Sequence, residues 1–427
     1  EFVWKKKMMK RDKKIVWQTL WLFVLSIGAS GLNYLFQIVL GNMLPVAEYG
    51  RFNVINSFLS NALVIFTPLT TMACRITAEQ QENIGRNRLI YKQILTIISL
   101  MVAVIVLLGM IFSPMEMKQY GIGNLQNWIL ILIIIAVSAY YTFNNSIVQG
   151  SGAFIFYGVM GMLLMTSKLL FSIFFIWTGR GLQGVLIALL LSFGVTTAIM
   201  ALYIQKKTKR NFKCEKMTEK VKKSVLIKLY GFTFLVQALY SLCINGGDVM
   251  LLGAIYDEVE IGQYTCAITL GKISLYITST VATVLFPSIA AAKAENKDTE
   301  RLYLKMLGVA LAFGSIYYIG LQCFGGYIIN ILYGSQYIKS AEYLSASGMF
   351  IIFIGMISIT NSYYLGVNKL EKYLLYLLIP MALVVLTVSW LKPSIEKAII
   401  LIGIGGMMTI FFSIVDVLRI EYGKKRK

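Results

Sequence analysis

The sequence predicts an all-α polytopic membrane protein with about twelve transmembrane helices, in two parallel six-helix halves around a central cavity. Of its 427 residues, 57% are hydrophobic and only 14% are charged, whereas a soluble globular protein has roughly 25% charged residues. Long apolar runs such as Ile129–Val137 and Leu182–Phe193 do not alternate with polar residues, as the strands of a membrane barrel would. Lipid is therefore the expected solvent for much of the surface.

Twelve segments are long enough to cross the membrane, because about 20 apolar residues in a helix span the hydrocarbon layer. Pro68, Pro287 and Pro380 fall inside the second, eighth and eleventh segments and predict kinks there. The expected spans are residues 15–40, 52–74, 92–113, 127–149, 154–178, 182–204, 230–255, 264–290, 304–325, 342–366, 372–390 and 397–418.

The distribution of Lys and Arg predicts the orientation. With twelve spans, 32 of the 40 basic residues fall on the side of both termini, six fall on the opposite side, and Lys168 and Lys272 lie inside spans. Basic residues mark cytoplasmic loops, so both termini are expected in the cytoplasm. Trp128, Trp177 and Trp390 fall at predicted outer ends, where an aromatic belt is expected.

Charge and composition exclude several functional classes. The net charge of +20 would suggest a nucleic-acid partner in a soluble protein, but here the basic residues flank helices, so no nucleic acid is expected. The chain has no histidine, its five cysteines show no metal or redox spacing, and no Gly-rich phosphate loop with lysine occurs. We therefore predict no metal, no cofactor, no ATP hydrolysis and no enzymatic activity.

An internal repeat supports the two halves. Leu40-Gly41 and Glu48-Tyr49-Gly50 recur as Leu252-Gly253 and Glu260-Ile261-Gly262, 212 residues later. A weaker match relates Gly150 and Tyr157 to Gly366 and Tyr373. Chance similarity is the alternative, but the Glu-x-Gly element lies outside the apolar runs. The expected divisions are an N-terminal half at 1–204, a basic cytoplasmic linker at 205–229 and a C-terminal half at 230–427.

Three motifs resemble a known family. These are Leu44-Pro45-Val46-Ala47-Glu48-Tyr49-Gly50, Asp248–Gly253 running into Val259–Tyr264, and Val284-Leu285-Phe286-Pro287. With these motifs the chain resembles the polysaccharide (Wzx-like) flippase branch of the multidrug/oligosaccharidyl-lipid/polysaccharide exporter superfamily. The lipid II flippase branch usually has fourteen spans, so the twelve expected here favour the Wzx-like branch. The resemblance implies a polyprenyl-pyrophosphate-linked oligosaccharide as substrate, membrane lipid as surroundings, and glycosyltransferases and a polymerase as candidate partners.

Charged groups at membrane depth are costly and are candidate functional residues. Asp248 in span 7 and Lys272 in span 8 lie about twelve residues from an outer turn centred near Glu260, so we expect them at one depth as a charge pair. The pair either lines the cavity and takes part in coupling, or is a static ion pair that compensates buried charge.

Two further basic residues are candidate substrate contacts. Lys168 lies in span 5, where it either binds a pyrophosphate or extends toward the interface. Arg75 ends span 2 at the cytoplasmic side, where it either meets a phosphorylated headgroup or only anchors the helix. Asp416, three residues before Arg419, is expected to form a local helical ion pair with it.

Three functions compete at this stage. The first is a flippase that moves a lipid-linked oligosaccharide from the inner to the outer leaflet by alternating access. The second is an ion-coupled multidrug or cation exporter, which unpaired acidic residues in the cavity would favour. The third is a membrane polysaccharide polymerase or glycosyltransferase. Such an enzyme would be expected to show a sizeable outer loop with catalytic carboxylates or arginines, but the predicted outer loops are short.

Overall fold

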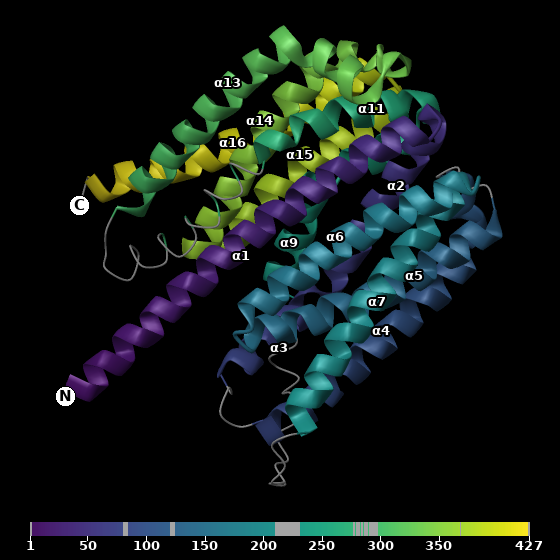
Figure 1. The fold of residues 1–427 in the computed structure, drawn as a ribbon. Helices are drawn as coiled ribbons and strands as arrows, with labels where there is room; N and C mark the ends of the chain where they lie inside the picture. The colour runs from purple at the N-terminus through teal and green to yellow at the C-terminus, as the bar shows by residue number, and fades with distance from the viewer. Residues whose placement is uncertain are drawn as a thin grey trace. The chain divides into compact units, whose positions relative to one another are not determined.

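The computed structural model describes residues 2–79, 84–119, 124–209, 231–275, 278, 282, 285, 289, 298–367 and 369–425. In this part of the chain every regular element is a helix (Figure 1), which confirms the predicted all-α class. Ten of these helices are long and apolar enough to cross a membrane, or eleven if one bent pair forms a single span. The remaining predicted span, 264–290, extends into residues outside the described part of the chain.

The helices form two compact units. Unit 1 comprises Glu1–Leu44 and Ile65–Leu226, and unit 2 comprises Pro45–Val64 and Ile227–Lys427. The segment Pro45–Val64 thus packs with helices that follow it much later in the sequence. The division at 1–204, 205–229 and 230–427 stays a prediction, and most of the expected linker lies outside the described residues.

Unit 1 is a bundle in which α1 packs along α6, and α7 packs along both α5 and α6 (Figure 1). Small residues bring the helices together, since Gly158 faces Leu25 and Gly28 faces Met162, as is usual between membrane helices. Its helices are α1 (Phe2–Met43), α3 (Thr67–Glu79), α4 (Ile84–Gln119), α5 (Leu125–Gly150), α6 (Phe154–Trp177) and α7 (Gly181–Lys209).

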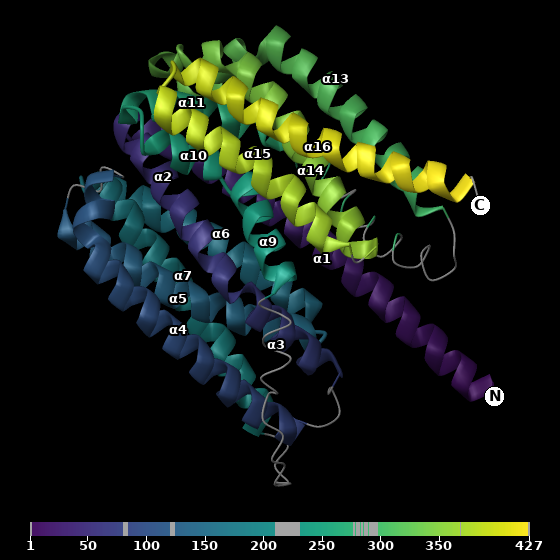
Figure 2. The ribbon, with the colours of Figure 1, turned by 180° about the vertical axis from the view of Figure 1, so that it is seen from behind.

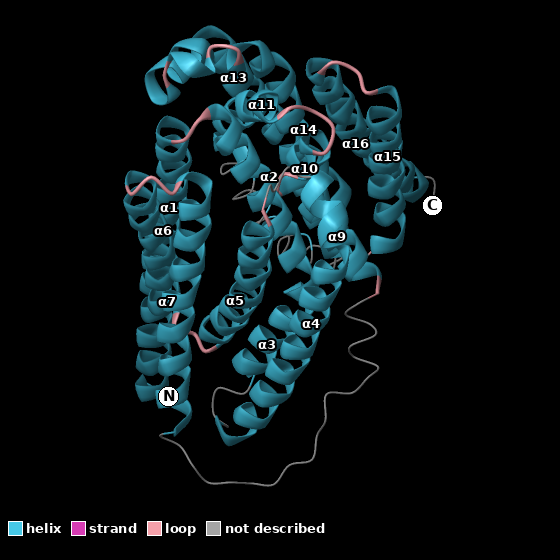
Figure 3. Cartoon of the chain, turned by 90° about the vertical axis from the view of Figure 1, so that its right-hand side faces the viewer, coloured by secondary structure: helices cyan, strands magenta, loops and turns pink. Residues whose placement is uncertain are grey.

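Unit 2 repeats this packing scheme (Figure 2). The neighbours α13–α14, α14–α16 and α15–α16 correspond in chain order to α4–α5, α5–α7 and α6–α7 of unit 1, which supports the repeat seen in the sequence. The helices of unit 2 are α2 (Val46–Ala62), α9 (Phe232–Ile244), α10 (Gly247–Gly253), α11 (Glu258–Gly271), α13 (Thr299–Tyr333), α14 (Ser340–Val367), α15 (Leu370–Leu391) and α16 (Ile395–Lys425). Figure 3 shows that loops join them without strands in the described part of the chain.

The seventh span is broken between α9 and α10, which meet at a bend of 67°. Gly246 stands at the break with φ of +85°, a conformation that residues with a Cβ rarely adopt. The repeat places Tyr34 at the equivalent position, and there α1 continues without interruption. The break therefore follows from the glycine, and it sets Asp248 near the start of α10.

The second span is interrupted by a 3₁₀ segment, Leu63–Phe66, between α2 and α3. Pro68 lies just after it and cannot donate a backbone hydrogen bond, and its ring would clash with the carbonyl four residues earlier in a regular helix. This is the physical reason for the interruption that Pro68 predicted. The boundary between unit 2 and unit 1 falls within the same segment.

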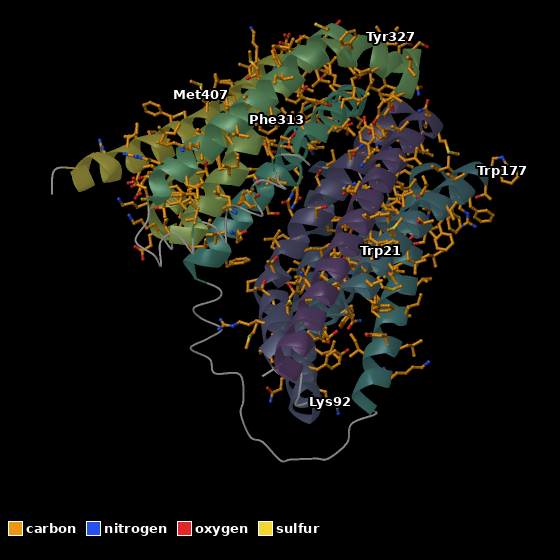
Figure 4. All side chains as sticks on the ribbon, turned by 60° about the vertical axis from the view of Figure 1, so that its left-hand side comes forward. Trp21, Lys92, Trp177, Phe313, Tyr327 and Met407 are labelled. Atoms are coloured by element: carbon orange, nitrogen blue, oxygen red, sulfur yellow. The ribbon has the colours of Figure 1, made fainter. Side chains whose placement is uncertain are left out.

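Large apolar side chains cover much of the surface, as expected of helices that face lipid. Figure 4 shows Trp21, Trp177, Phe313, Tyr327 and Met407 on the outside of the helices that carry them. The tryptophan at position 128 is an exception to the belt predicted from sequence. Its side chain is buried, and its indole N–H donates to the carbonyl of Gly109 at 2.9 Å, so it packs α5 against α4.

Candidate functional site

Lys168 is a buried basic residue of unit 1. Its side chain is 7% exposed on α6, and its ammonium nitrogen lies 4.1 Å from the centre of the Phe36 ring on α1. A cation over an aromatic face is attracted by the electrons of the ring. Among the described residues, no carboxylate forms an ion pair with Lys168. Its charge is therefore held by a ring and not neutralised by an acid.

The sequence of unit 1 explains why this cation lacks an acid. All acidic residues of the unit lie outside its spanning segments. They are Glu1, Asp12, Glu79, Glu82, Glu116, Glu215 and Glu219. The membrane interior of unit 1 is thus positively biased, which suits an anionic ligand.

Arg75 lies near one end of unit 1. It is exposed on α3, next to Cys74, whose carbonyl packs against Gly150 at the end of α5. Since α6 begins at Phe154, Arg75 lies at the level of the turn between α5 and α6. Lys168 is 14 residues further along α6, or about 21 Å at 1.5 Å per residue. Arg75 and Lys168 therefore mark the end and the interior of unit 1.

Unit 2 contains a buried acidic residue, Asp248, whose place in the repeat is close to that of Lys168 in unit 1. Asp248 is 6% exposed, and one of its carboxylate oxygens accepts a hydrogen bond of 2.5 Å from the hydroxyl of Tyr264 on α11. The other oxygen is buried without a hydrogen-bond partner among the described atoms. A cavity of about 150 Å³ adjoins the carboxylate. It is lined by Leu242, Cys243, Gly247, Leu251, Phe350, Ile357, Met381, Val384, Val385, Ile402, Gly405, Gly406 and Thr409.

The structure does not join Asp248 to Lys272 by an ion pair, although both residues lie in its described part. The reason is the position of the turn. Helix α10 ends at Gly253 and α11 begins at Glu258, so the turn is centred about four residues before Glu260. Tyr264 therefore reaches the depth of Asp248, and Lys272 follows it by eight residues, about 12 Å along a helix. Lys272 is half-buried at the end of α11.

Asp416 also has a different partner from the one predicted. Its carboxylate pairs with the ammonium of Lys372 on α15 at 2.9 Å and accepts a hydrogen bond from Tyr364 on α14 at 3.1 Å. The helical neighbour Arg419 was the expected partner, but Asp416 is buried and faces α14 and α15 while Arg419 is exposed. This interaction ties together three helices of unit 2 and has a structural role.

The two buried charges occupy related places in the repeat. The spacing of 212 residues maps Asp248 onto Phe36, the ring beneath Lys168. The spacing between Tyr157 and Tyr373 maps Lys168 onto Val384, which lines the cavity beside Asp248. Unit 1 therefore has a cation where unit 2 has an anion. The sequence predicted both charged residues but did not predict Tyr264 as the partner of Asp248. The feature that marks Tyr264 in the sequence is its hydroxyl group, which its repeat equivalent, Phe52, lacks.

The fold is shared with solved transporters. The inward-facing conformation of a multidrug resistance MATE family transporter of the MOP superfamily matches with a TM-score of 0.74 and 15% identity, over 93% of this chain and 96% of that one. The lipid II flippase MurJ in an inward closed conformation matches with a TM-score of 0.73 and 15% identity, over 93% and 87%. A MOP superfamily transporter from Pyrococcus furiosus matches with a TM-score of 0.63 and 18% identity, over 97% and 96%.

The family assignment comes from the sequence. No curated protein matches the chain. The model of the family described as "Polysaccharide biosynthesis protein" matches residues 101–342, which is more than half of the chain. Together with the fold, this match confirms the branch that the three motifs resemble: the chain belongs to the polysaccharide biosynthesis protein family and has the fold of the MOP superfamily.

Proposed function

We propose that this protein is a flippase that moves a polyprenyl-pyrophosphate-linked oligosaccharide from the inner to the outer leaflet of a bacterial cytoplasmic membrane. The translocated glycan would serve surface polysaccharide biosynthesis, with glycosyltransferases and a polymerase acting before and after transport. The match to the polysaccharide biosynthesis family supports the substrate class. The fold supports transport, since a lipid II flippase also adopts it.

The observation that carries the proposal is the buried, acid-free environment of Lys168. A pyrophosphate and its sugars cannot cross hydrocarbon unaided, because burying charged and polar groups without partners is prohibitive. Lys168 offers a cation at membrane depth with no competing carboxylate in the spanning segments of unit 1. Charge-assisted hydrogen bonds to phosphate oxygens are among the strong ones in proteins. Lys168 would thus bind the anionic head during transport.

Arg75 and Lys272 complete the proposed path. Arg75 is exposed at the end of unit 1 where both α5 and α3 end, which the charge distribution assigns to the cytoplasmic side. It would meet the headgroup on entry, while the polyprenyl tail remains in lipid. Lys272 of unit 2 provides a further basic group, in addition to Lys168 of unit 1. Alternating access would carry the head between these positions.

Asp248 is the proposed coupling residue. It carries a buried carboxylate with one hydrogen bond from Tyr264 and one oxygen without a partner among the described atoms, and the residue lines a mostly apolar cavity. A buried ionisable group at membrane depth responds strongly to the arrival of a proton or cation, because its charge is costly there. Binding at Asp248 would then favour one conformation of the protein over the other.

Transport in proteoliposomes tests the proposal. The purified protein is reconstituted with a polyprenyl-pyrophosphate oligosaccharide, and a glycosidase that cannot cross the bilayer reports the glycan that reaches the outer leaflet. Lys168→Ala should slow transfer by about tenfold or more, as expected from loss of a charge-assisted contact. Lys92→Ala, which removes an exposed lysine on α4 (Figure 4), should leave the rate unchanged. Transfer by Lys168→Ala at the wild-type rate would refute the role of Lys168.

The cavity beside Asp248 favours a second function, that of an ion-coupled exporter of lipophilic cations. Its wall is apolar apart from Asp248 and Thr409, a combination that suits an apolar cation. Binding of a fluorescent lipophilic cation to the purified protein separates the two functions. The exporter predicts binding that Asp248→Asn abolishes and that the lipid-linked glycan does not compete for. The flippase predicts no such binding.

A further inference from the structure

Helices α2 and α11 cross with their backbones in direct contact. A Cβ atom at Gly50 would overlap the carbonyl oxygen of Glu258 and lie 2.7 Å from the amide nitrogen of Gly262. A Cβ atom at Gly262 would overlap the carbonyl oxygen of Val46. No side chain larger than hydrogen fits at either position without moving a helix backbone.

The contact is symmetric with respect to the repeat. The spacing of 212 residues that relates Gly50 to Gly262 also relates Val46 to Glu258. Each glycine therefore meets the carbonyl of the residue four positions before the other glycine. Equivalent segments of the two repeats therefore make reciprocal contacts, as across a local two-fold axis. A change in how α2 and α11 cross affects both segments in the same way.

An ion pair joins α2 and α11 at the edge of their crossing. Arg51, next to Gly50, pairs with Glu258, and the two side chains are 37% and 30% exposed. Beside them the ring of Tyr49 packs against Tyr333 and Tyr337, with centroids 6.3 and 5.8 Å away. The charge distribution predicts that this end of unit 2 faces the outside. A partly exposed ion pair contributes little to stability, so it can open at small cost.

The face of α2 below the crossing is polar. Asn53, Ser57 and Asn61 repeat every four residues, and therefore form one stripe of the helix. Asn61 accepts a hydrogen bond from Ser241 of α9 at 3.2 Å. Ser57 packs so closely on Gly246 that a Cβ there would overlap its hydroxyl. Asn53 and Asn61 also donate to the carbonyls of Tyr49 and Ser57, each at 2.9 Å, so the stripe is hydrogen-bonded while it is buried. The same amide and hydroxyl groups can bond to water or sugar hydroxyls when the face is exposed.

The two ends of α2 allow it to move as a unit. At its start, α1 ends at Met43 and Pro45 precedes the first residue, Val46. At its end lies the 3₁₀ segment Leu63–Phe66, and such a segment within a span often marks a hinge. Beyond both breaks the chain belongs to unit 1, although α2 itself packs in unit 2.

We propose that α2 is the moving element of an outer gate, closed by the Gly50–Gly262 crossing and the Arg51–Glu258 ion pair. Opening separates α2 from α9, α10 and α11 and exposes the stripe of Asn53, Ser57 and Asn61 to water from the outside. The hydroxyl and amide groups of the stripe then face the glycan as it leaves. The inference rests on the proposed alternating access, but its test requires no glycan.

The test measures access of water to Asn53. The five native cysteines are replaced by serine, Asn53→Cys is introduced, and the protein in glycan-free proteoliposomes reacts with a maleimide that cannot cross the membrane. Arg51→Gln and Glu258→Gln should each raise the rate of labelling by about twofold to fivefold, the range expected for a partly exposed ion pair. The double variant Arg51→Glu with Glu258→Arg re-forms the ion pair with its charges exchanged. It should return the rate of labelling toward that of the Asn53→Cys parent.

Three controls make the result specific. Lys339→Gln removes an exposed outer charge that does not belong to the pair and should change nothing. A cysteine at Trp390, which is 88% exposed, normalises for reagent access. Gly50→Ala should raise labelling of Asn53→Cys, whereas Gly308→Ala, with nothing within 4 Å of the added Cβ, should not.

The outcomes separate the gate from the proposed function. Labelling at the parent rate in both Arg51→Gln and Glu258→Gln would show a static interface and overturn the gate, even if Gly50→Ala fails to fold. A gate that responds as expected, in a protein that does not move the lipid-linked glycan, would contradict the flippase and leave the gate intact.

Discussion

Tyr264 donates a 2.5 Å hydrogen bond to Asp248, and this contact links α11 to α10 inside unit 2. Both side chains are buried. The carboxylate has a second oxygen that finds no partner among the described atoms. Among the described residues, the acid is thus held by one neutral hydrogen-bond donor, the Tyr264 hydroxyl.

Tyr264→Phe tests this relationship. The variant removes the hydroxyl from a buried carboxylate and should lower the free energy of unfolding by about 1–3 kcal/mol. In an Asp248→Asn background the same change should cost less, because the charge that needed the donor is gone. Thermal unfolding of the purified single and double variants in detergent measures the coupling. Tyr327→Phe, at a side chain that is 71% exposed, is the matched control.

The partner of Asp416 gives a second prediction. Lys372→Gln should lower the thermal stability of the protein by an amount of about 1 kcal/mol or less, since Lys372 is mostly exposed. Arg419→Gln should have no measurable effect, because the ion pair is formed with Lys372. A larger loss of stability in Arg419→Gln than in Lys372→Gln would instead support the local ion pair between Asp416 and Arg419 that the sequence predicted. Unfolding curves of the two variants, recorded under the same conditions, decide between them.

The orientation gives a third prediction. The 32-to-6 distribution of basic residues predicts that both termini lie in the cytoplasm. Alkaline phosphatase, which is active only outside the cytoplasm, should therefore show no activity when fused after Lys427. A fluorescent protein that folds only in the cytoplasm should fluoresce at the same site. High phosphatase activity would place the C-terminus outside the cytoplasm and contradict the twelve-span topology with both termini inside.

The sequence predicted the elements well because their signal is local. Each span is a run of apolar residues, and Pro68 marked the interruption between α2 and α3. It did not predict that α2 packs with unit 2, because this depends on the close fit of Gly50 and Gly262, which are far apart in the sequence.

The candidate site was predicted only in part for a similar reason. Lys168 and Asp248 were evident as charges inside apolar segments. Their partners were not, since Phe36 and Tyr264 are ordinary aromatic residues whose roles depend on how helices face each other. The shift of the turn before α11 by about four residues was enough to replace Lys272 with Tyr264 beside Asp248.

Glycan export in cells tests the central claim most directly. In a strain that depends on this protein for its surface polysaccharide, Lys168→Ala together with Lys272→Ala should abolish surface glycan. The variant protein should still reach the membrane, and the lipid-linked oligosaccharide should accumulate on the cytoplasmic leaflet. Lys92→Ala together with Lys305→Ala removes two exposed lysines and should leave export normal. Normal surface glycan in the Lys168→Ala, Lys272→Ala protein would contradict the account.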